Sequence, residues 1–402
     1  MLAFTAAAAR LVEAFRGRFS LSSSTSAPNL VSEPLVHVLA VVGARPNFVK
    51  MSALVAALRA EARFRVTLLH TRQHYDDRLS QALFDQLDLP RPDVELEIPT
   101  GSHALQTAST MRHFDAALDR LGPVDVVLVV GDVNSTLAAA LVAVKRGIRV
   151  AHVEAGLRSF NWAMPEEINR VVTDRLADLL FTPSADADEN LRREGIPAER
   201  IHRVGNVMID TLLAHRARAR ETRSAERLGV AGRDYAVATL HRQENVDGRE
   251  TLAGLAGALV EAARRLPVIF AAHPRTRNRL REFALEGGLR AAQGLTLLEP
   301  LGYLEFLDLV AGARVTLTDS GGLQEETTVL GVPCLTLRGE TERPVTVTHG
   351  TNRVVGTAPP AILDALDAAL AAPRPEGRVP PLWDGRAASR VAAVLGRVLA
   401  KG

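Results

Sequence analysis

Carboxylate and imidazole side chains stand directly after short apolar runs at several places in this 402-residue chain. Asp132 follows a run of valines and leucine, Glu154 follows the next apolar run, and His241 and His273 follow two later ones. Carboxylates and imidazoles are the groups that most often move protons in enzymes. Burying a carboxylate at the end of an apolar strand is costly without a purpose. The pattern therefore predicts acid–base chemistry at strand ends.

The alternative for each of these groups is structural. Asp132 is also placed to favour a helix dipole, with Asn134 or Ser135 as the cap of that helix. A single histidine at a strand end is usually structural, but two histidines at the ends of successive strands of one sheet favour a functional role more than one alone does.

Glu166 and Glu167 follow Pro165, which is typical of a helix start. One of the two glutamates is expected to favour the dipole of that helix, and Glu166 is the candidate for catalysis. Arg158 and Arg170 are the expected partners of this acidic segment, and an ion-pair network that only holds the loop is the alternative.

Arg45 and Lys50 lie in the loop after the first apolar run, Gly43–Lys50. The loop has neither the Gly-Lys-Ser/Thr of a phosphate-binding loop nor the spaced glycines of a dinucleotide fingerprint. Two cations near a helix N-terminus still favour anion binding, and a solvated pair of cations is the alternative. Gln73 and His74 follow the second apolar run, where His74 either donates to a ligand or is a structural loop residue.

The segment Thr318–Glu326 carries the sharpest pattern. A strand ends before Ser320, and Gly321 and Gly322 allow a ligand to approach the backbone at a helix start. Backbone N–H groups there suit a diphosphate, and Glu325 or Glu326 one turn later suits a pair of ribose hydroxyls. A plain turn followed by acidic residues is the alternative. Thr341–Pro344 adds an arginine near the same edge.

Apolar runs alternate with amphipathic stretches along the chain, which predicts an α/β fold with two doubly wound, Rossmann-like domains facing a cleft. We expect a flexible extension over residues 1–35, domains over 36–204 and 205–375, and a final segment with a helix over 376–402. Expected strands are Val36–Val42, Arg65–Leu69, Val124–Val130, Val150–Val153, Leu180–Thr182, Tyr235–Leu240, Pro267–Ala271, Thr296–Leu298, Val315–Thr318 and Pro333–Thr336. Expected helices are Phe48–Ala60 after a turn over Gly43–Asn47, Leu105–Arg120, Ser135–Lys145, Glu167–Leu179, Glu250–Arg265, Thr276–Leu285, Tyr303–Ala311, Gly322–Val329 and Ala387–Ala400.

Composition narrows the function classes. Hydrophobic residues are 47% and charged residues 23% of the chain, as in globular enzymes. A formal net charge of +2 without a dense basic stripe argues against a nucleic-acid partner. The lack of a long apolar span argues against membrane insertion, so a cytoplasmic location is expected. The single cysteine, Cys334, is expected to be a buried thiol and excludes a multi-cysteine metal site.

These motifs, in their order along the chain, resemble the non-hydrolysing UDP-N-acetylglucosamine 2-epimerases. The resemblance extends from about His37 to about Gly356. Each motif is weak alone, but the ordered set is highly specific: Gly43–Met51, Gln73-His74, Gly131-Asp132, His152–Arg158, Pro165–Arg170, Gly205-Asn206, His241–Asn245, Asp319–Glu326 and Thr341–Pro344.

The resemblance implies a GT-B-like fold whose C-terminal helix returns to the first domain, and a homodimer. It implies interconversion of UDP-GlcNAc and UDP-ManNAc through a 2-acetamidoglucal, with no nicotinamide cofactor and no required metal. The implied catalytic residues are Asp132, Glu154, Glu166 and His241. The implied substrate-binding residues are Arg45, Lys50, Gln73, His74, Arg170, His273, Ser320, Gly321, Gly322 and Glu326.

Some positions depart from the commonest family pattern. Ala44 replaces a frequent threonine, Asn47-Phe48 replaces a Glu-Ala pair, and Gln243 replaces an arginine. Because relatives act on other 2-acetamido sugars, these changes leave the exact UDP-sugar open. A GT-B glycosyltransferase is the rival with the same fold, but it usually needs one catalytic base rather than a set of carboxylates.

Overall fold

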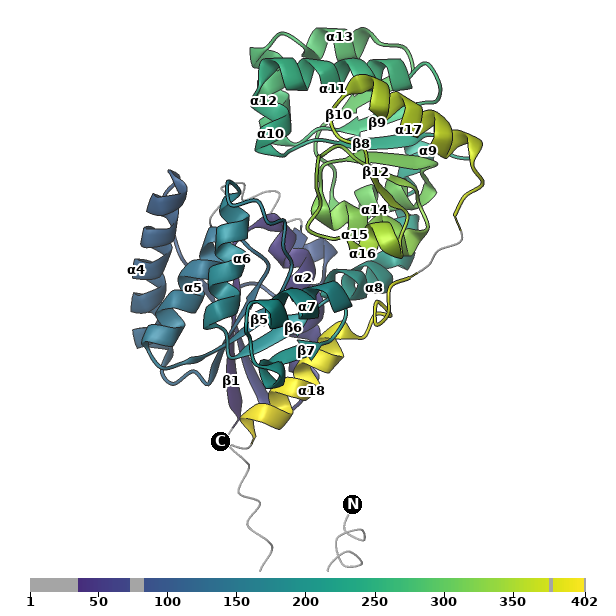
Figure 1. Ribbon diagram of the computed structural model, residues 1–402. Helices are drawn as coiled ribbons and strands as arrows, with labels where there is room; N and C mark the ends of the chain where they lie inside the picture. The colour runs from purple at the N-terminus through teal and green to yellow at the C-terminus, as the bar shows by residue number, and fades with distance from the viewer. Residues whose placement is uncertain (1–34, 73–82, 376–378, 401–402) are drawn as a thin grey trace, which may run out of the picture. The chain divides into compact units, whose positions relative to one another are not determined.

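The computed structural model describes residues 35–72, 83–375 and 379–400. In these ranges the chain forms two parallel β-sheets, each with helices on both faces (Figure 1). The predicted α/β class with two Rossmann-like sheets is therefore confirmed. The predicted extension over residues 1–35 lies, apart from Leu35, outside the described residues.

The first sheet has seven strands in the described ranges, in the order β3-β2-β1-β4-β5-β6-β7. Its strands are β1 (Val36–Val42), β2 (Phe64–His70), β3 (Val94–Glu95), β4 (Val126–Val130), β5 (Arg149–Val153), β6 (Leu179–Thr182) and β7 (Ile201–Arg203).

The second sheet has six described strands in the order β10-β9-β8-β11-β12-β13. They are β8 (Ala236–Thr239), β9 (Val268–Ala271), β10 (Leu295–Leu298), β11 (Val315–Thr318), β12 (Cys334–Thr336) and β13 (Asn352–Val354). In both sheets the strand order reverses beside the first strand, between β1 and β4 and between β8 and β11. Open parallel sheets bind ligands at such switch points, beyond the carboxyl ends of the strands.

Helices connect the strands and cover both faces of each sheet (Figure 1). The helices are α2 (Arg45–Arg59), α4 (His103–Leu121), α5 (Asn134–Lys145), α6 (Pro165–Leu176), α7 (Ala185–Arg193), α8 (Val207–Glu221), α9 (Ser224–Arg227), α10 (Gln243–Val246), α11 (Arg249–Ala262), α12 (Pro274–Glu282), α13 (Glu286–Ala291), α14 (Tyr303–Gly312), α15 (Gly321–Leu330), α16 (Val345–Thr348), α17 (Pro359–Ala371) and α18 (Ala387–Leu399). A proline in the first turn favours the starts of α2, α6, α12 and α17. An asparagine or serine side chain caps the starts of α4, α8 and α15.

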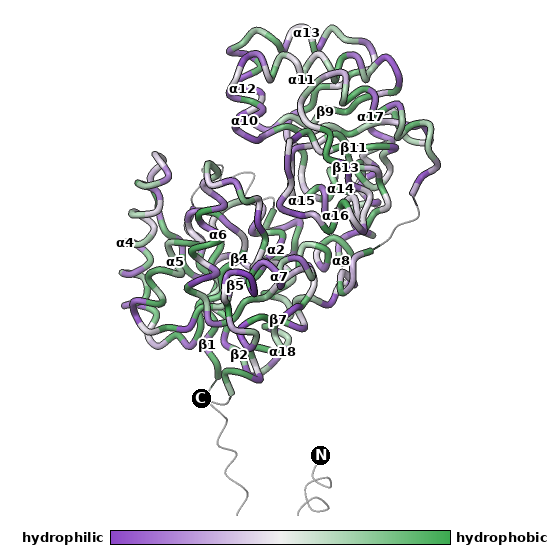
Figure 2. Tube along the Cα trace, viewed as in Figure 1, coloured by the Kyte–Doolittle hydropathy of each residue, from purple (hydrophilic) through white to green (hydrophobic). Residues whose placement is uncertain are grey.

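Alternation along β1 shows how one strand serves two cores. Val38, Ala40 and Val42 pack into one hydrophobic cluster with α2, α8 and α18, whereas Leu39 and Val41 pack into another with α4 and α5. Side chains of a strand point alternately to the two faces of its sheet, so a strand buried on both faces is apolar throughout. Figure 2 shows these strands as hydrophobic segments.

The C-terminal helix α18 packs against α2 beside the first sheet. Its first turn is held by Asp210, whose carboxylate accepts a hydrogen bond of 2.7 Å from the Ala388 amide. The apolar face of α18 is thus buried in the core that contains β1. The domain boundaries expected from the sequence remain a prediction.

Several element boundaries differ from the sequence-based prediction. Helix α2 begins at Arg45, inside the expected turn, because Pro46 suits a first helical turn and forms no barrier there. Helix α6 ends at Leu176, and Leu179 begins β6. Short edge strands β3, β7 and β13 and helices α7, α8 and α17 were not predicted. The edge strands lack the apolar run that marks a buried strand.

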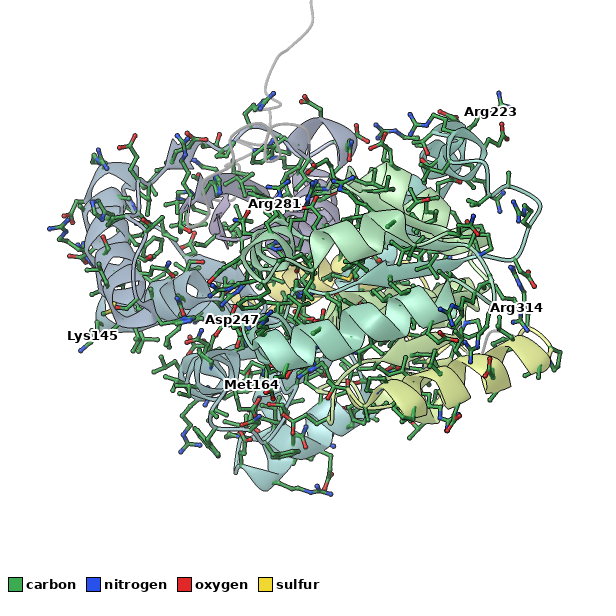
Figure 3. All side chains as sticks on the ribbon, turned by 90° about the horizontal axis from the view of Figure 1, so that it is seen from above. Lys145, Met164, Arg223, Asp247, Arg281 and Arg314 are labelled. Carbon is green, nitrogen blue, oxygen red and sulfur yellow. The ribbon has the colours of Figure 1, made fainter. Side chains whose placement is uncertain are left out.

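The charged side chains of the described residues lie mostly at the surface, as Lys145 and Arg223 do at the periphery in Figure 3. Among the described residues, no helix is both long enough and apolar enough to cross a membrane. The buried thiol expected for Cys334 is confirmed.

Two glycines in the left-handed region offer a matched test of this backbone. Gly205 (φ +92°) precedes the cap of α8, and an added Cβ would overlap the Leu382 carbonyl oxygen. Gly229 (φ +68°) has no atom within 4 Å of such a Cβ. We expect Gly229→Ala to lower the free energy of unfolding by about 1–2 kcal/mol, and Gly205→Ala by at least about 3 kcal/mol. Equal losses in urea denaturation would contradict the close approach at Gly205.

Candidate active site

A cavity of about 360 Å³ lies at the switch points of the two sheets. The first part of α2 and the loops after β4, β8 and β11 all contribute to it. Its wall has an apolar part around Leu301, Tyr303 and Phe306 and a charged part around Lys50 and Arg343. A pocket that combines an apolar wall with a few convergent polar groups is the usual form of a small-molecule site.

The structure brings most of the predicted site residues together. Eight of them line the cavity: Lys50, Asp132, His241, His273, Ser320, Gly321, Gly322 and Glu326. Glu154 and Arg170 lie immediately behind it, because each is ion-paired with a lining residue. Their roles in binding or catalysis stay predictions.

Four predicted residues are placed differently. Glu166 is half-buried in the first turn of α6 and does not line the cavity, although its charge acts on Arg242. Arg45 is the first residue of α2, but its side chain is not among those described. Gln73 and His74 lie outside the described residues.

Glu154 links the two halves of the site. One carboxylate oxygen pairs with the Lys50 ammonium, and the other accepts a hydrogen bond of 2.8 Å from Arg343 Nη2. Glu154 lies in the loop after β5 and Lys50 lies in α2, both beside the first sheet, whereas Arg343 follows β12 of the second sheet. All three side chains are at most 8% exposed. Such a buried cluster is stable only while every charge has a partner.

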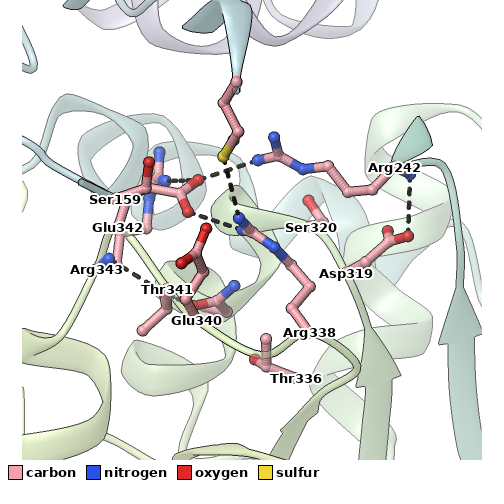
Figure 4. A network of polar contacts seen from close by, with 12 residues as sticks. Ser159, Arg242, Asp319, Ser320, Thr336, Arg338, Glu340, Thr341, Glu342 and Arg343 are labelled. Atoms are coloured by element: carbon pink, nitrogen blue, oxygen red, sulfur yellow. Dashed lines mark hydrogen bonds and ion pairs between the residues drawn. The ribbon is translucent and has the colours of Figure 1, made fainter. Parts of the chain in front are cut away.

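Arg343 and Glu342 form the centre of a wider charge network, shown in Figure 4. The Arg343 guanidinium lies 2.8 Å from Glu325 Oε1 and 2.8 Å from Glu342 Oε1. Glu342 also accepts from Arg338 at 2.7 Å and from Arg242 at 3.0 Å. Burial alone would raise the pKa of Glu342, but the three arginines outweigh it and hold that pKa well below its ordinary value.

Asp132 is held from several directions. Its carboxylate lies 2.6 Å from Arg170 Nη1, and its backbone carbonyl accepts a hydrogen bond of 2.8 Å from Asn169. Burial opposes the charge of Asp132, yet Arg170 and Lys50 outweigh it and lower the pKa. Asp132 is therefore an ionised carboxylate at the cavity wall, which suits a general base.

Arg170 is not free to leave this position, because it also binds Glu167 at 2.7 Å. Glu167 in turn accepts from the backbone amides of Ser159 and Phe160. The expected pairing of Arg170 with the acidic pair is thus confirmed for Glu167. Arg158 has different partners from those expected, Asp174 and Glu194.

His241 is oriented by Asp319, which is fully buried. The Asp319 carboxylate lies 2.7 Å from His241 Nδ1 and accepts from the backbone amides of His241 and Arg242. Burial would raise the pKa of Asp319, but His241 and these amides lower it to about 2. With Nδ1 turned to Asp319, the other ring nitrogen is the one available for a ligand. Asp319 thereby ties the loop after β8 to the turn after β11.

The first turn of α15 forms one end of the cavity. The Ser320 hydroxyl caps the helix by accepting from Leu323 N at 3.4 Å, so it is engaged locally. A Cβ on Gly321 would overlap the Arg343 guanidinium, and one on Gly322 would lie 3.1 Å from Met208 Cε. Glycine therefore permits the close approach of Arg343 to a helix start, where unpaired amides and the dipole attract anions.

Glu326 lies one turn further along α15 and faces the apolar wall. Its Oε1 accepts a hydrogen bond of 3.1 Å from the Tyr303 hydroxyl, and the Tyr303 amide donates to Gln86 at 2.8 Å. Burial is the main cause that raises the pKa of Glu326 to about 7. The carboxylate thus changes its charge near neutral pH, next to the position expected for a ribose.

Sequence reasoning missed part of this site. Arg343 and Asp319 stand in motifs that it singled out, but neither was assigned a role. Tyr303 and Glu342 were not assigned either, because contacts between distant loops leave no local pattern. The expected cap of α5 by Asn134 or Ser135 is wrong: Val133 occupies the cap position without a side-chain bond. Asn134 instead donates to Gln106 at 2.9 Å.

Among the described residues, no group of three or more histidine, cysteine, aspartate or glutamate side chains is arranged to hold a metal ion. The cationic side chains and the start of α15 are the groups of the described site that favour an anion.

The raised pKa of Glu326 predicts a specific pH dependence of stability. The unfolded chain loses this proton near pH 4.5, whereas the folded chain keeps it to about pH 7. Wild-type protein therefore loses stability as pH rises between these values. Glu326→Gln should remove that loss, so its stability relative to wild type should rise by about 3 kcal/mol between pH 4 and pH 8.

Urea denaturation across this pH range measures the difference. The exposed Glu221 provides the control, because Glu221→Gln should differ from wild type by a constant amount. A constant difference for Glu326→Gln as well would show that burial does not raise this pKa.

Comparison with known proteins adds the family. A family model described as UDP-N-acetylglucosamine 2-epimerase matches residues 56–396. The UDP-N-acetylglucosamine 2-epimerase of Methanocaldococcus jannaschii is 41% identical over 360 residues, covering 88% of this chain and 97% of the relative. A UDP-2,3-diacetamido-2,3-dideoxy-D-glucuronate 2-epimerase of Pseudomonas aeruginosa is 38% identical over 368 residues, covering 90% of this chain and 100% of the relative.

Solved structures agree with this result. The chain resembles the Methanocaldococcus jannaschii UDP-GlcNAc 2-epimerase in complex with UDP-GlcNAc and UDP, with a TM-score of 0.84, 39% identity and coverage of 91% of this chain and 100% of that one. It also resembles the Neisseria meningitidis UDP-GlcNAc 2-epimerase bound to UDP-GlcNAc, with a TM-score of 0.82, 28% identity and the same coverage. The fold is GT-B-like, and the chain belongs to the UDP-N-acetylglucosamine 2-epimerase family.

Proposed function

We propose that this chain interconverts UDP-N-acetylglucosamine and UDP-N-acetylmannosamine by inverting sugar carbon 2. UDP is eliminated to leave a 2-acetamidoglucal and is then added back. The observation that carries the proposal is a single cavity in which Lys50, Arg343 and the start of α15 lie close to Asp132 and His241. Family membership and the named substrates of the relatives support it.

The chemistry explains why both kinds of group are needed. The hydrogen on carbon 2 has no adjacent carbonyl, so its direct removal is very slow. When the bond from carbon 1 to the UDP oxygen lengthens, positive charge develops at carbon 1 and the hydrogen on carbon 2 becomes acidic. Stabilising the departing diphosphate is therefore the main electrostatic task of the site.

Each half-reaction is balanced without a redox partner. A base takes the proton from carbon 2, the C–H electron pair forms the double bond to carbon 1, and UDP leaves with the pair of the broken C–O bond. In the return, an acid protonates carbon 2 from the opposite face, and the UDP oxygen attacks carbon 1. One base and one acid on opposite faces of the sugar are required.

Named groups take these roles in the proposal. Lys50, Arg343, Arg45 and the backbone amides at Gly321 and Gly322 bind the diphosphate. Because Lys50 and Arg343 are the two partners of Glu154, an arriving diphosphate competes directly with that carboxylate. Glu326 binds the ribose in its ionised form, and His273, Arg170, Gln73, His74 and Ser320 complete the substrate site.

Asp132, Glu154 and Glu166 form the acid–base set, with His241 directed at the leaving oxygen. Asp132 is the best-supported base, because it is ionised and its side chain is 27% exposed at the cavity. Glu154 becomes available when the diphosphate takes over its cations. Glu166 enters the proposal through family resemblance, since it does not line the cavity.

The same chemistry on a related UDP-2-acetamido sugar is the second candidate. The relative from Pseudomonas aeruginosa that is 38% identical acts, by its name, on a diacetamido-glucuronate. A homodimer and a cytoplasmic location are further parts of the proposal, which rest on the family alone.

Product analysis by NMR in heavy water tests the function. Incubation with UDP-GlcNAc alone should give UDP-ManNAc with one deuterium on carbon 2, because the proton is exchanged at the glycal stage. Parallel incubations with UDP-diacetamido sugars identify the preferred substrate. Absence of deuterium on carbon 2 of the product would contradict the elimination route, and accumulation of UDP with free sugar would indicate a hydrolysing enzyme.

The same assay tests Glu154. We expect Glu154→Gln to lower kcat by about 100- to 10,000-fold, while the affinity for UDP, measured by calorimetry, stays within threefold or improves. Glu286, which is ion-paired with Arg290 at 2.7 Å on the second sheet's periphery, supplies the control. Glu286→Gln should leave kcat unchanged. Unchanged turnover in Glu154→Gln would remove this residue from the mechanism.

A further inference from the structure

A buried histidine–aspartate pair lies behind the loops that carry Asp132 and Glu154. His152 is on β5 and Asp174 is on α6, and neither is exposed to solvent. His152 Nδ1 lies 2.6 Å from Asp174 Oδ1, and His152 Nε2 lies 2.9 Å from the Gly131 carbonyl oxygen. Neither residue lines the cavity, so neither touches a substrate there.

The pair reaches both catalytic loops. Through Nε2, His152 holds the carbonyl of Gly131 and thereby the orientation of the peptide that leads into Asp132. Asp174 Oδ2 accepts a hydrogen bond of 3.0 Å from the Gly156 amide, on the loop that follows Glu154. In the sequence, Glu154 thus lies midway between His152 and Gly156, and the Asp174 carboxylate binds both of these residues.

Glu154 needs such anchors because its backbone is strained. Its φ is +71°, in the left-handed region that residues with a side chain seldom adopt. Strain of this kind persists only where the surroundings determine the conformation. The Glu154 amide also donates to the Phe181 carbonyl at 3.0 Å. In this conformation the carboxylate of Glu154 contacts Lys50 and Arg343.

The two catalytic loops are also in contact with each other. Gly131 has φ +70°, and an added Cβ would lie 3.2 Å from Glu154 Oε2 and 3.3 Å from Lys50 Nζ. The Gly131 amide donates to the Val153 carbonyl at 3.1 Å. A shift of the Gly131 peptide would therefore move Asp132 and disturb Glu154 at the same time.

Neighbouring charges keep the pair in place. Arg158 Nη1 lies 2.7 Å from Asp174 Oδ2, and the same guanidinium binds Glu194 at 2.7 Å. Burial alone would raise the pKa of Asp174, but His152 and Arg158 outweigh it and keep that pKa below its ordinary value. Asp174 is therefore an ionised hydrogen-bond acceptor for both His152 and the Gly156 amide.

We propose that His152 and Asp174 are positioning residues for the reaction: together they hold the Gly131–Asp132 peptide and the left-handed Glu154 in the geometry that proton transfer needs. The inference rests on the proposed epimerase function. Misplacement of a reacting group by about 1 Å can cost about 100-fold in rate. Loss of the pair should therefore lower kcat and leave UDP binding nearly unchanged.

Paired substitutions at Asp174 separate position from charge. Asp174→Ala removes both anchors, and we expect kcat to fall tenfold to a hundredfold while the Kd for UDP changes less than threefold. Asp174→Asn removes the same charge but keeps an oxygen for Gly156 and an amide group next to His152. It should recover most of the wild-type kcat. Turnover is expressed per UDP-binding site, so that partial unfolding does not count as lost catalysis.

Asp188 provides the matched control. It is also buried in the first sheet's helices, and it binds Thr182 and Arg203. Asp188→Ala should lower the unfolding temperature and leave kcat unchanged. If Asp174→Ala keeps wild-type kcat, or if Asp174→Asn loses as much kcat as Asp174→Ala, the positioning role is wrong.

Substitutions at His152 test the same idea independently. The amide of glutamine reaches the place of Nε2 and can still donate to Gly131, whereas that of asparagine reaches only the place of Nδ1. We expect His152→Asn to lose at least fivefold more kcat than His152→Gln, and equal losses would overturn the inference. Wild-type protein without epimerase activity would instead refute the proposed function, so the two failures are distinguishable.

Discussion

Two buried cations, Lys50 and Arg343, share the carboxylate of Glu154. The other groups of the site lie around these two ion pairs. Removing one partner from such a buried group leaves an uncompensated charge, which costs several kcal/mol. Lys50 therefore leaves Glu154 at little cost only when another anion takes its place, whereas Arg343 keeps Glu325 and Glu342 as partners. A diphosphate is such an anion, and the helix start at Gly321 lies next to Arg343. In the proposed function, this exchange of partners couples the binding of the diphosphate to the release of the Glu154 carboxylate.

The fold places these charges by repeating one arrangement. Each sheet reverses its strand order beside its first strand, and each reversal brings two loops together beyond the strand ends. Lys50, in α2, and Asp132, in the loop after β4, lie at the first reversal, and His241 and Ser320 come from the two loops of the second. Arg343, which follows β12, and Tyr303, at the start of α14, complete the wall. The apolar strands behind these loops supply the rigid support that precise proton transfer requires.

Strand bounds and site residues could be predicted from the sequence where a local pattern marks them. The bounds of β1 and β11 follow from their apolar runs, and the glycines after Ser320 mark a close approach of ligand or side chain. The positions of Arg343 and Asp319 were visible in motifs, but their pairing with Glu154 and His241 was not, because these partners lie 189 and 78 residues away in the sequence. The helical start at Arg45 and the uncapped start of α5 were mispredicted, because Pro46 suits a first helical turn and Asn134 binds Gln106 instead of capping the helix. The pair His152–Asp174 illustrates the same limit, because only the fold shows that both residues meet behind the catalytic loops.

A crystal structure of the chain with UDP bound tests the central claim most directly. The account predicts that phosphate oxygens lie within hydrogen-bond distance of Lys50 Nζ and Arg343, and that Glu154 has lost its contact with at least one of them. A diphosphate bound elsewhere, with both cations still on Glu154, would contradict it.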